Sequence, residues 1–234
     1  MLLRLDPDAR WPVLLAAVRD EFLGRPWDLP AEYWPGLVGG RDRVGGGTWL
    51  AVDPDASAVA ALLNGPRLPD LPEGVRPSRG RLALDALRSG VAADVSAYDG
   101  FHLLKATLDS TEVWSWDGVD LTYRTLGPGD HVIVNAGPDA IDPVVDSGGA
   151  LLDSVGAPSD DVSGPTRDVW GVWAEFLEGD PVDEPGRLLV RRDFDGRTYG
   201  SSSVALVALS RSGVRYDFSP VPASAKTWAR ILPR

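Results

Sequence analysis

The sequence predicts an α+β fold, a four-layer α/β/β/α sandwich of two packed antiparallel sheets with helices outside. Short apolar segments separated by turn signals follow one another along most of the 234 residues, as is typical of antiparallel strands. Only two or three segments show the spacing of an amphipathic helix. A chain of this length can bury a full core, and we expect one domain over residues 1–234.

The first two thirds of the chain are expected to be mainly strands with tight turns. Leu2–Leu5 and Val13–Val18 are apolar, and the turn-like segment Asp6–Trp11 between them predicts an antiparallel hairpin. The elements expected next are the strands Gly47–Val52 and Ala58–Asn64, a proline-rich loop Gly65–Pro77, a helix Arg79–Ser89, and a meander of Phe101–Thr107, Glu112–Trp116, Leu121–Leu126 and Asp130–Asn135.

The last third supplies a second helix and the closing strands. Pro165 suits a first helical position, and apolar residues recur at helical spacing as far as Gly179, which predicts a helix over Pro165–Glu178. The other expected elements are the strands Arg187–Val190, Ser203–Leu209 and Val214–Phe218, followed by a short helix Ala223–Ile231.

Composition excludes several classes of function. The chain has 23 basic and 34 acidic residues, and its net charge of -11 disfavours nonspecific binding to nucleic acid or to an anionic membrane. No apolar stretch suits a signal peptide or reaches transmembrane length, so we expect a cytoplasmic protein with no membrane insertion. The absence of cysteine excludes a disulfide framework, a thiolate metal site and a thiol nucleophile within this sequence.

Several motifs occur in an informative order. They are VRDEFLGRP at Val18–Pro26, GGRDRVGGGTWL at Gly39–Leu50, AALLN at Ala60–Asn64, Val134–Asn135, and YGSSSV at Tyr199–Val204. Together they resemble the NRDE family, whose eukaryotic members are called transport and Golgi organisation proteins. The resemblance runs along most of the chain and implies an N-terminal-nucleophile (Ntn) hydrolase-like fold.

The resemblance also implies a site. In an Ntn hydrolase the side chain of the first mature residue attacks an amide carbonyl, and its own α-amine serves as the base. Arg19 and Asp20 match the Arg and Asp that cysteine members place beside that terminus. Asn64 and Asn135 match amide donors to the substrate carbonyl or its oxyanion. We therefore expect these four residues to converge on one cleft near the N-terminus.

The sequence departs from the family pattern at three places. Met1-Leu2 stands where the family has Met-Cys, Val18 replaces the Asn of its Asn-Arg-Asp-Glu motif, and Tyr199–Ser203 lacks the family's Arg. Each change removes a polar group that could serve a site, so the resemblance alone does not make this chain an active enzyme.

The hairpin register leads to the same residues without the family. If Asp6–Trp11 closes the turn, Leu5 pairs with Pro12 and Met1 with Ala16, and the second strand carries Arg19 and Asp20 past Met1. Our hypothesis is that the natural start lies upstream and supplies a cysteine. The alternative is that Met1 is the start and the nucleophile is lacking.

Three functions follow from these alternatives. The first is a C–N (amide) hydrolase acting on a small acylated substrate. The second is a noncatalytic carrier or chaperone for haem or a lipid-like ligand, since eukaryotic relatives are linked to haem trafficking and lipid metabolism. The third is a degenerate scaffold that binds protein partners. We expect no resident cofactor, with haem only as a candidate ligand held by His102, His131 or a Tyr; the sequence does not predict the oligomeric state.

Other candidate sites have simpler structural explanations. His102 and His131 lie on separate predicted strands with no third metal ligand nearby in sequence. Ser201–Ser203 lacks a Gly-x-Ser-x-Gly elbow. The Gly45–Gly47 run lacks the Lys-Ser/Thr of a phosphate-binding loop and favours a turn.

Overall fold

The chain folds into two compact units that alternate along the sequence. The computed structural model describes residues 1–68, 76–92, 94–138, 140–159 and 163–233. The first unit comprises Met1–Arg25, Pro128–Val134 and Ala140–Arg234, and the second comprises Pro26–Gly127 and Asn135–Asp139. The expected organisation as one domain stays a prediction.

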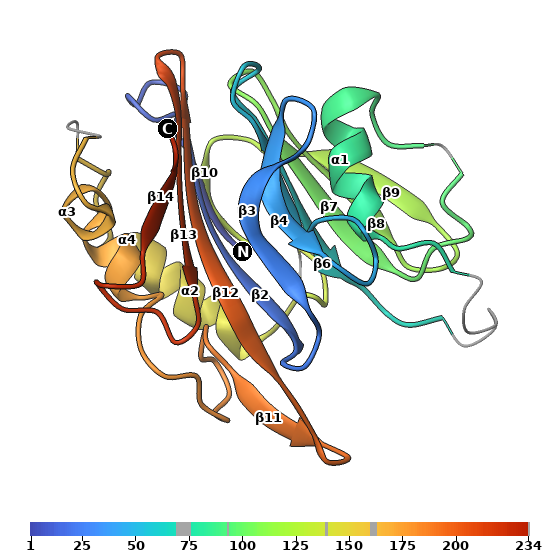
Figure 1. Cartoon of the computed structure of the whole chain (residues 1–234). Helices are drawn as coiled ribbons and strands as arrows, with labels where there is room; N and C mark the ends of the chain where they lie inside the picture. The colour runs from blue at the N-terminus through green and yellow to red at the C-terminus, as the bar shows by residue number, and fades with distance from the viewer. Residues whose placement is uncertain (69–75, 93, 139, 160–162, 234) are drawn as a thin grey trace. The chain divides into compact units, whose positions relative to one another are not determined.

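The first unit contains a seven-stranded antiparallel sheet (Figure 1). Its strand order is β10-β1-β2-β12-β13-β14, and β11 pairs with an extension of β12. The strands are β1 (Leu2–Leu5), β2 (Val13–Phe22), β10 (Gly129–Val132), β11 (Arg191–Phe194), β12 (Arg197–Ser210), β13 (Gly213–Pro220) and β14 (Ala229–Leu232).

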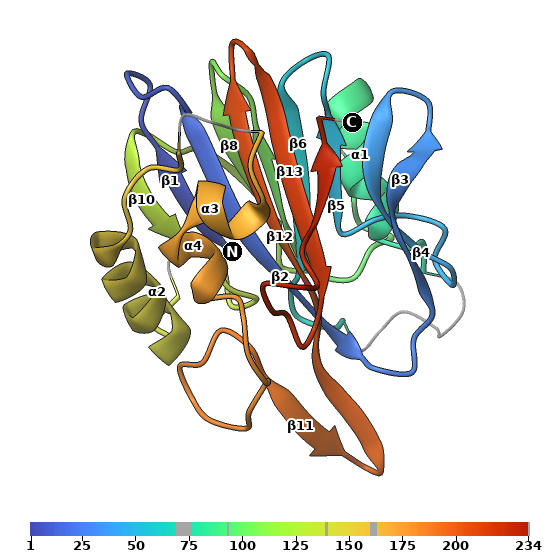
Figure 2. The ribbon, with the colours of Figure 1, turned by 60° about the vertical axis from the view of Figure 1, so that its left-hand side comes forward.

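Three helices cover one face of this sheet (Figure 2). They are α2 (Pro143–Ser154), α3 (Thr166–Trp170) and α4 (Val172–Glu175). Leu14 and Leu206 from the sheet share a buried apolar cluster with Leu152 of α2 and Trp173 of α4. Burial of such side chains is the main source of stability for the unit.

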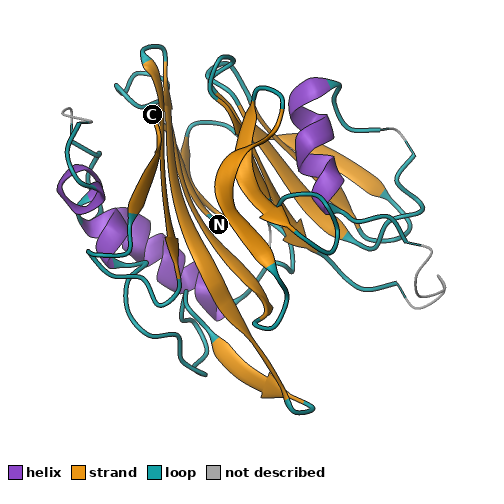
Figure 3. Ribbon diagram, viewed as in Figure 1, coloured by secondary structure: helices purple, strands orange, loops and turns teal. Residues whose placement is uncertain are grey.

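The second unit contains the other seven-stranded antiparallel sheet, ordered β3-β4-β5-β6-β7-β8-β9. Helix α1 (Gly80–Arg88) lies on one face of this sheet (Figure 3). Its Leu82, Ala83 and Ala86 share a buried apolar cluster with Phe101 and Leu103. The strands are β3 (Trp27–Trp34), β4 (Leu37–Asp42), β5 (Leu50–Asp53), β6 (Ala58–Asn64), β7 (Phe101–Ala106), β8 (Thr111–Trp116) and β9 (Leu121–Thr125). Two antiparallel sheets with few helices confirm the predicted class.

The predicted N-terminal hairpin forms, but its predicted register is wrong by one residue. Leu5 pairs with Val13 rather than Pro12, and Leu2 rather than Met1 pairs with Ala16. The reason is that Asp6 belongs to the ladder, because its N–H donates to the Pro12 carbonyl at 3.0 Å.

Several other predicted elements need correction. The segment predicted as Asp130–Asn135 leaves the meander, because β10 pairs with β1 in the other sheet. The predicted helix Pro165–Glu178 divides at Gly171, whose φ of 52° ends α3. The predicted helix at Ala223–Ile231 is wrong, since β14 pairs there with β13.

Further differences concern where elements lie. The strand predicted at Arg187–Val190 lies further on, as β11, and β3, β4 and α2 were not predicted. The middle of the predicted loop Gly65–Pro77, residues 69–75, lies outside the described residues. Within the described ranges, no helix is long and apolar enough to cross a membrane.

Candidate functional site at the end of strand β2

Arg19 and Asp20 lie near the end of β2, where that strand pairs with the serine-rich part of β12. Asp20 faces Ser201 and Arg19 faces Ser203, so Ser202 is the extra residue of a β-bulge. A bulge of this kind breaks the side-chain alternation and redirects its residues. The local result is that Ser201 hydrogen-bonds to Asp20 and Ser202 hydrogen-bonds to Arg19.

The Arg19 side chain is buried, with 7% of its surface exposed. Its Nη1 donates to Ser202 Oγ at 2.9 Å, and the same hydroxyl donates to the Arg19 carbonyl at 3.1 Å. Its Nη2 lies 3.7 Å from Glu21 Oε2, which is also 3.5 Å from Arg25 Nε. Arg19 is therefore a fixed positive charge whose position the bulge determines.

Asp20 is half-buried and accepts a hydrogen bond from Ser201 Oγ at 2.7 Å. Ser201 Oγ in turn accepts from the Val190 N–H at 2.9 Å. Burial raises the pKa of the Asp20 carboxyl, while the Ser201 hydrogen bond and the nearby α-amine oppose that increase. The carboxylate is thus oriented by one serine and lies within the electrostatic field of the chain terminus.

The α-amine of Met1 lies in the same region of the first unit. It donates to the Ile133 carbonyl at 2.7 Å, and the Ile133 N–H donates back to the Met1 carbonyl at 2.9 Å. Burial lowers the pKa of this amine from 8.0 to about 6, and Asp20 acts in the opposite direction. An amine with this pKa is mainly neutral at pH 7 and can take up a proton as a base.

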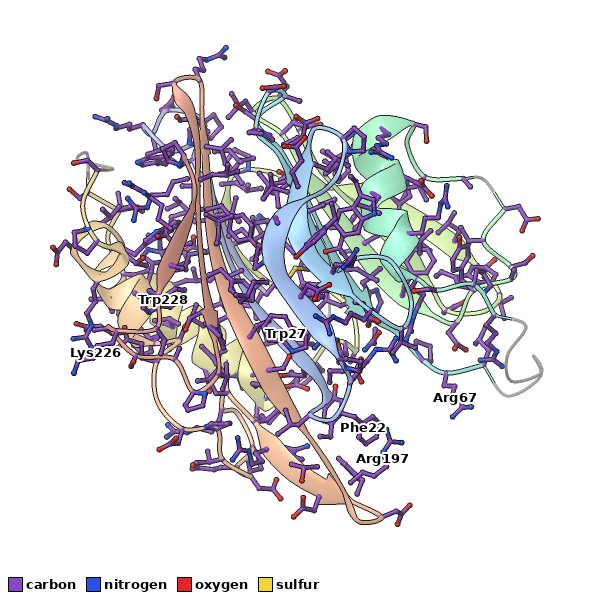
Figure 4. All side chains as sticks on the ribbon, viewed as in Figure 1. Phe22, Trp27, Arg67, Arg197, Lys226 and Trp228 are labelled. Atoms are coloured by element: carbon purple, nitrogen blue, oxygen red, sulfur yellow. The ribbon has the colours of Figure 1, made fainter. Side chains whose placement is uncertain are left out.

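Aromatic contacts hold the far end of β2 in place. The Phe22 ring lies edge-on to Tyr199 with their centroids 5.5 Å apart, and the Arg197 guanidinium carbon is 3.8 Å from the Phe22 centroid. Figure 4 labels Phe22 and Arg197, which lie close together. Burial, followed by Asp20 and Glu21, raises the pKa of Tyr199 to about 12, so its hydroxyl stays protonated.

The second predicted pair, Asn64 and Asn135, belongs to the other unit. Asn64 is the last residue of β6 and pairs with Phe101, whereas Asn135 lies in a turn after β10. The next residue on β7, His102, has a ring hydrogen bond with the Asn135 backbone. The two asparagines therefore approach the same end of β7, and convergence of all four residues on one cleft stays a prediction.

His102 has a second partner that sequence reasoning missed. Its Nδ1 lies 2.8 Å from Ser115 Oγ on β8. The two residues are directly opposite in the β7–β8 hairpin, so a correct hairpin register would have revealed the pair. The sequence suggests His102 only as a metal or haem ligand. In the structure its ring already has hydrogen bonds to Ser115 and to the Asn135 backbone.

Ligand clusters and cavities are the features that could hold a metal or a cofactor. Among them, no group of three or more His, Asp or Glu side chains has an arrangement that could hold a metal ion. A cavity of about 490 Å³ lies in the first unit, lined mainly by acidic and apolar residues of the segments 147–151 and 175–189. Neither Arg19 nor Asp20 lines it.

Comparisons with known proteins bear on the family and the fold of the chain. A family model described as Transport and Golgi organisation 2 matches residues 1–168. No curated protein matches the chain. Among solved structures, penicillin V acylase from Agrobacterium tumefaciens superposes with a TM-score of 0.50 at 12% identity, covering 99% of this chain and 86% of that one. This likeness shows the Ntn-hydrolase-like fold.

Proposed function

Because the chain belongs to the Transport and Golgi organisation 2 family, we propose that the terminus of β1 with Arg19 and Asp20 is a C–N (amide) hydrolase centre. The reaction proposed is cleavage of a small acylated amide by an N-terminal thiol. The sequence contains no cysteine, so the centre needs a nucleophile beyond the residues printed.

One observation carries the proposal, namely the buried α-amine beside Asp20. In this class of reaction the amine must be unprotonated to accept the nucleophile's proton. The α-amine at position 1, with its pKa of about 6, meets that requirement at neutral pH and serves a cysteine placed at position 1. For a cysteine further upstream, what carries over is the carboxylate of Asp20 near the start of β1, because the Met1 nitrogen is then part of a peptide bond. Asp20 lies where a carboxylate would orient the amine and stabilise it once protonated. The Ile133 carbonyl accepts a hydrogen bond from the amine and so helps to orient it.

Arg19 has the role of favouring the thiolate. A thiol with a pKa near 8.5 is mostly protonated at neutral pH, and an adjacent guanidinium lowers that pKa by about one unit or more. Continuing the observed register, Arg19 faces the position two residues before Met1. Asn64 and Asn135 are proposed as the amide donors to the oxyanion.

The test supplies the missing nucleophile at defined positions. One variant carries Met1→Cys as its first residue, and another begins with a cysteine two residues before Met1, each released by a protease that leaves cysteine first. Penicillin V and a panel of N-acyl amides are offered, and release of the amine is measured. We expect turnover from at least one variant, and a loss of about 100-fold or more when alanine replaces the cysteine.

Two readouts separate chemistry from folding. In the active variant, Asp20→Asn should lower turnover, whereas Arg19→Gln should slow alkylation of the thiol by iodoacetamide near pH 7. Asp8→Asn, at an exposed turn, is the matched control and should change neither rate. If both cysteine variants fold but give no cysteine-dependent turnover, the hydrolase proposal is wrong.

The ligand-carrier alternative has less support where it relies on haem held by His102. An axial haem ligand needs a free ring nitrogen, and His102 is bonded to Ser115 on one side and to Asn135 on the other. Binding of haem through His102 would have to break one of these hydrogen bonds.

A further inference from the structure

The His102–Ser115 pair has the arrangement of a nucleophile and its base. His102 lies on β7 and Ser115 on β8, in direct cross-strand register, with Nδ1 and Oγ 2.8 Å apart. That separation is within the range in which a serine hydroxyl transfers its proton to imidazole. Both side chains belong to the second unit and lie on the sheet face opposite α1, since Phe101 and Trp116 on either side pack with that helix.

The Asn135 backbone fixes which ring nitrogen carries the hydrogen. Its hydrogen bond raises the pKa of His102, as an accepting carbonyl does, whereas burial lowers that pKa more strongly. Since Nδ1 bonds to Ser115, we infer that Nε2 is the nitrogen that bonds to the Asn135 backbone and carries the proton. Nδ1 is then an unprotonated acceptor for the Ser115 hydroxyl, and the imidazole is neutral at pH 7.

The surroundings hold the ring but leave the serine approachable. Gly137 packs against the ring closely enough that a Cβ there would lie 3.3 Å from His102 Cε1. Across the sheet, Ser115 pairs with Thr122 of the edge strand β9, which is exposed, while Ser115 itself is half-buried. The three cross-strand neighbours therefore become more exposed towards the sheet edge: His102 is buried, Ser115 is half-buried and Thr122 is exposed.

We propose that Ser115 is a second nucleophile of this protein, activated by His102, which accepts an acyl group from a carboxylic ester. Ser115 Oγ bonds to the acyl carbon and its proton passes to His102 Nδ1. The acyl–oxygen bond of the ester then breaks and the alcohol leaves with that proton. Water attacks the acyl–serine, gives a proton to His102, and the proton returns to Ser115 Oγ as the carboxylic acid departs.

The Asn135 carbonyl, which orients the His102 ring, determines which class of ester is expected to react. A carboxylate behind the histidine stabilises the imidazolium that forms, whereas the neutral Asn135 carbonyl stabilises it less. Esters whose leaving group depends least on receiving that proton are therefore favoured, so aryl esters of small acids are the expected substrates. This inference does not depend on the proposed amide hydrolase, because it uses no cysteine and no residue of β1 or β2. The one residue common to both proposals is Asn135, whose backbone acts here and whose side chain acts there.

The experiment uses the full chain and p-nitrophenyl acetate. Release of p-nitrophenolate is followed, and the acetylated residue is located by mass spectrometry of peptides. We expect acetyl on Ser115, abolished by Ser115→Ala and slowed about 100-fold by His102→Gln, which keeps a hydrogen-bonding side chain but cannot accept the proton. Ser96→Ala removes an exposed serine paired with Asp94 and is the matched control, expected to leave Ser115 acetylation unchanged.

Two further readouts keep the proposal falsifiable. Acetylation of the Met1 α-amine in the same digests is an internal reference, which His102→Gln should not change. Thermal unfolding reports whether each variant folds. The proposal is overturned if the wild-type chain is not acetylated at Ser115, or if a folded His102→Gln variant is acetylated there at the wild-type rate.

Discussion

The Ser201 hydroxyl donates to the Asp20 carboxylate at 2.7 Å while it accepts from the Val190 N–H at 2.9 Å. One buried side chain thus satisfies a carboxylate on β2 and a backbone donor that precedes β11. Ser203, two residues further along β12, is equally buried, yet its hydroxyl is without a hydrogen-bond partner among the described residues. The two serines therefore differ in hydrogen bonding at the same level of burial.

We predict that alanine at position 201 lowers the free energy of unfolding, whereas alanine at position 203 does not. Ser201→Ala should lower the free energy of unfolding by about 1–3 kcal/mol, because it leaves a buried N–H and a carboxylate oxygen unpaired. Ser203→Ala should be neutral or stabilising, because it removes a hydroxyl that is desolvated without compensation. Urea denaturation of the three chains measures both values, and equal losses would contradict the assignment.

A second prediction concerns the buried charge at the helix-covered face of the first unit. Asp217 is fully buried and accepts from Arg215 Nε at 2.6 Å, Thr166 Oγ1 at 2.6 Å and Trp170 Nε1 at 2.8 Å. Asp217→Ala should cost about 3–5 kcal/mol, because the Arg215 guanidinium stays buried without its carboxylate.

The double variant Arg215→Met with Asp217→Leu is the control for that prediction. It removes both charges, so its loss in denaturant titration should be smaller than that of Asp217→Ala alone. A double variant at least as unstable as the single one would show that the cost arises from packing rather than from the unpaired charge.

Much of the strand pattern was predictable, and the misses have physical causes. Pro30 lies within β3 and removes a ladder donor, which argues against a strand unless that strand is at a sheet edge, as β3 is. Gly39 weakens the strand signal of β4, yet a Cβ there would lie 2.4 Å from the Leu50 carbonyl oxygen. Pro30 is suitable because β3 is an edge strand, and Gly39 is suitable because the Leu50 backbone lies so close; both facts depend on the tertiary structure.

A third prediction concerns the protonation of the chain terminus. Met1 is the only methionine, so labelling with ¹³Cα-methionine gives one NMR signal whose shift follows the α-amine. Its midpoint should lie at about 6, because burial disfavours the charged amine. Asp20→Asn should lower the midpoint further, since the carboxylate stabilises the protonated form. A midpoint near 8 in the folded chain would contradict the burial of the amine.

The same shift predicts how stability depends on pH. The folded pKa lies below the ordinary value of 8.0, so the unfolded chain binds the proton more readily between these values. This amine's contribution is therefore fully present above pH 8 and is lost as the pH falls towards about 6, amounting to about 2–3 kcal/mol. Denaturant titrations at pH 8 and pH 6, repeated for Asp20→Asn, measure it.

The candidate site was predictable only in part. Arg19 and Asp20 are adjacent in sequence, so one strand assignment places both near the end of β2, and the electrostatic effect on the α-amine comes from Asp20. The supporting serines depend on a bulge at Ser202, and no sequence rule identifies a bulge between two otherwise regular strands. The Ser115–His102 pair needs the hairpin register, which a one-residue error would destroy.

The last prediction tests the packing of α2 on β1 and on the neighbouring edge strand β10. Two adjacent glycines obscure this helix in the sequence, but their surroundings differ. A Cβ at Gly149 meets nothing within 4 Å, whereas a Cβ at Gly148 would lie 2.6 Å from Leu2 Cδ2 and 3.1 Å from both Val132 methyl carbons.

Gly149→Ala should therefore stabilise the chain by about 0.5–1 kcal/mol, because alanine restricts the unfolded backbone and favours the helix. Gly148→Ala gains the same propensity but must displace Leu2 or Val132, so we expect it to be less stable than Gly149→Ala by about 1 kcal/mol or more. Because Leu2 lies next to the α-amine, Gly148→Ala should also shift the Met1 NMR midpoint. Equal stabilities and an unchanged midpoint would show that α2 does not pack on β1 and β10 at Gly148.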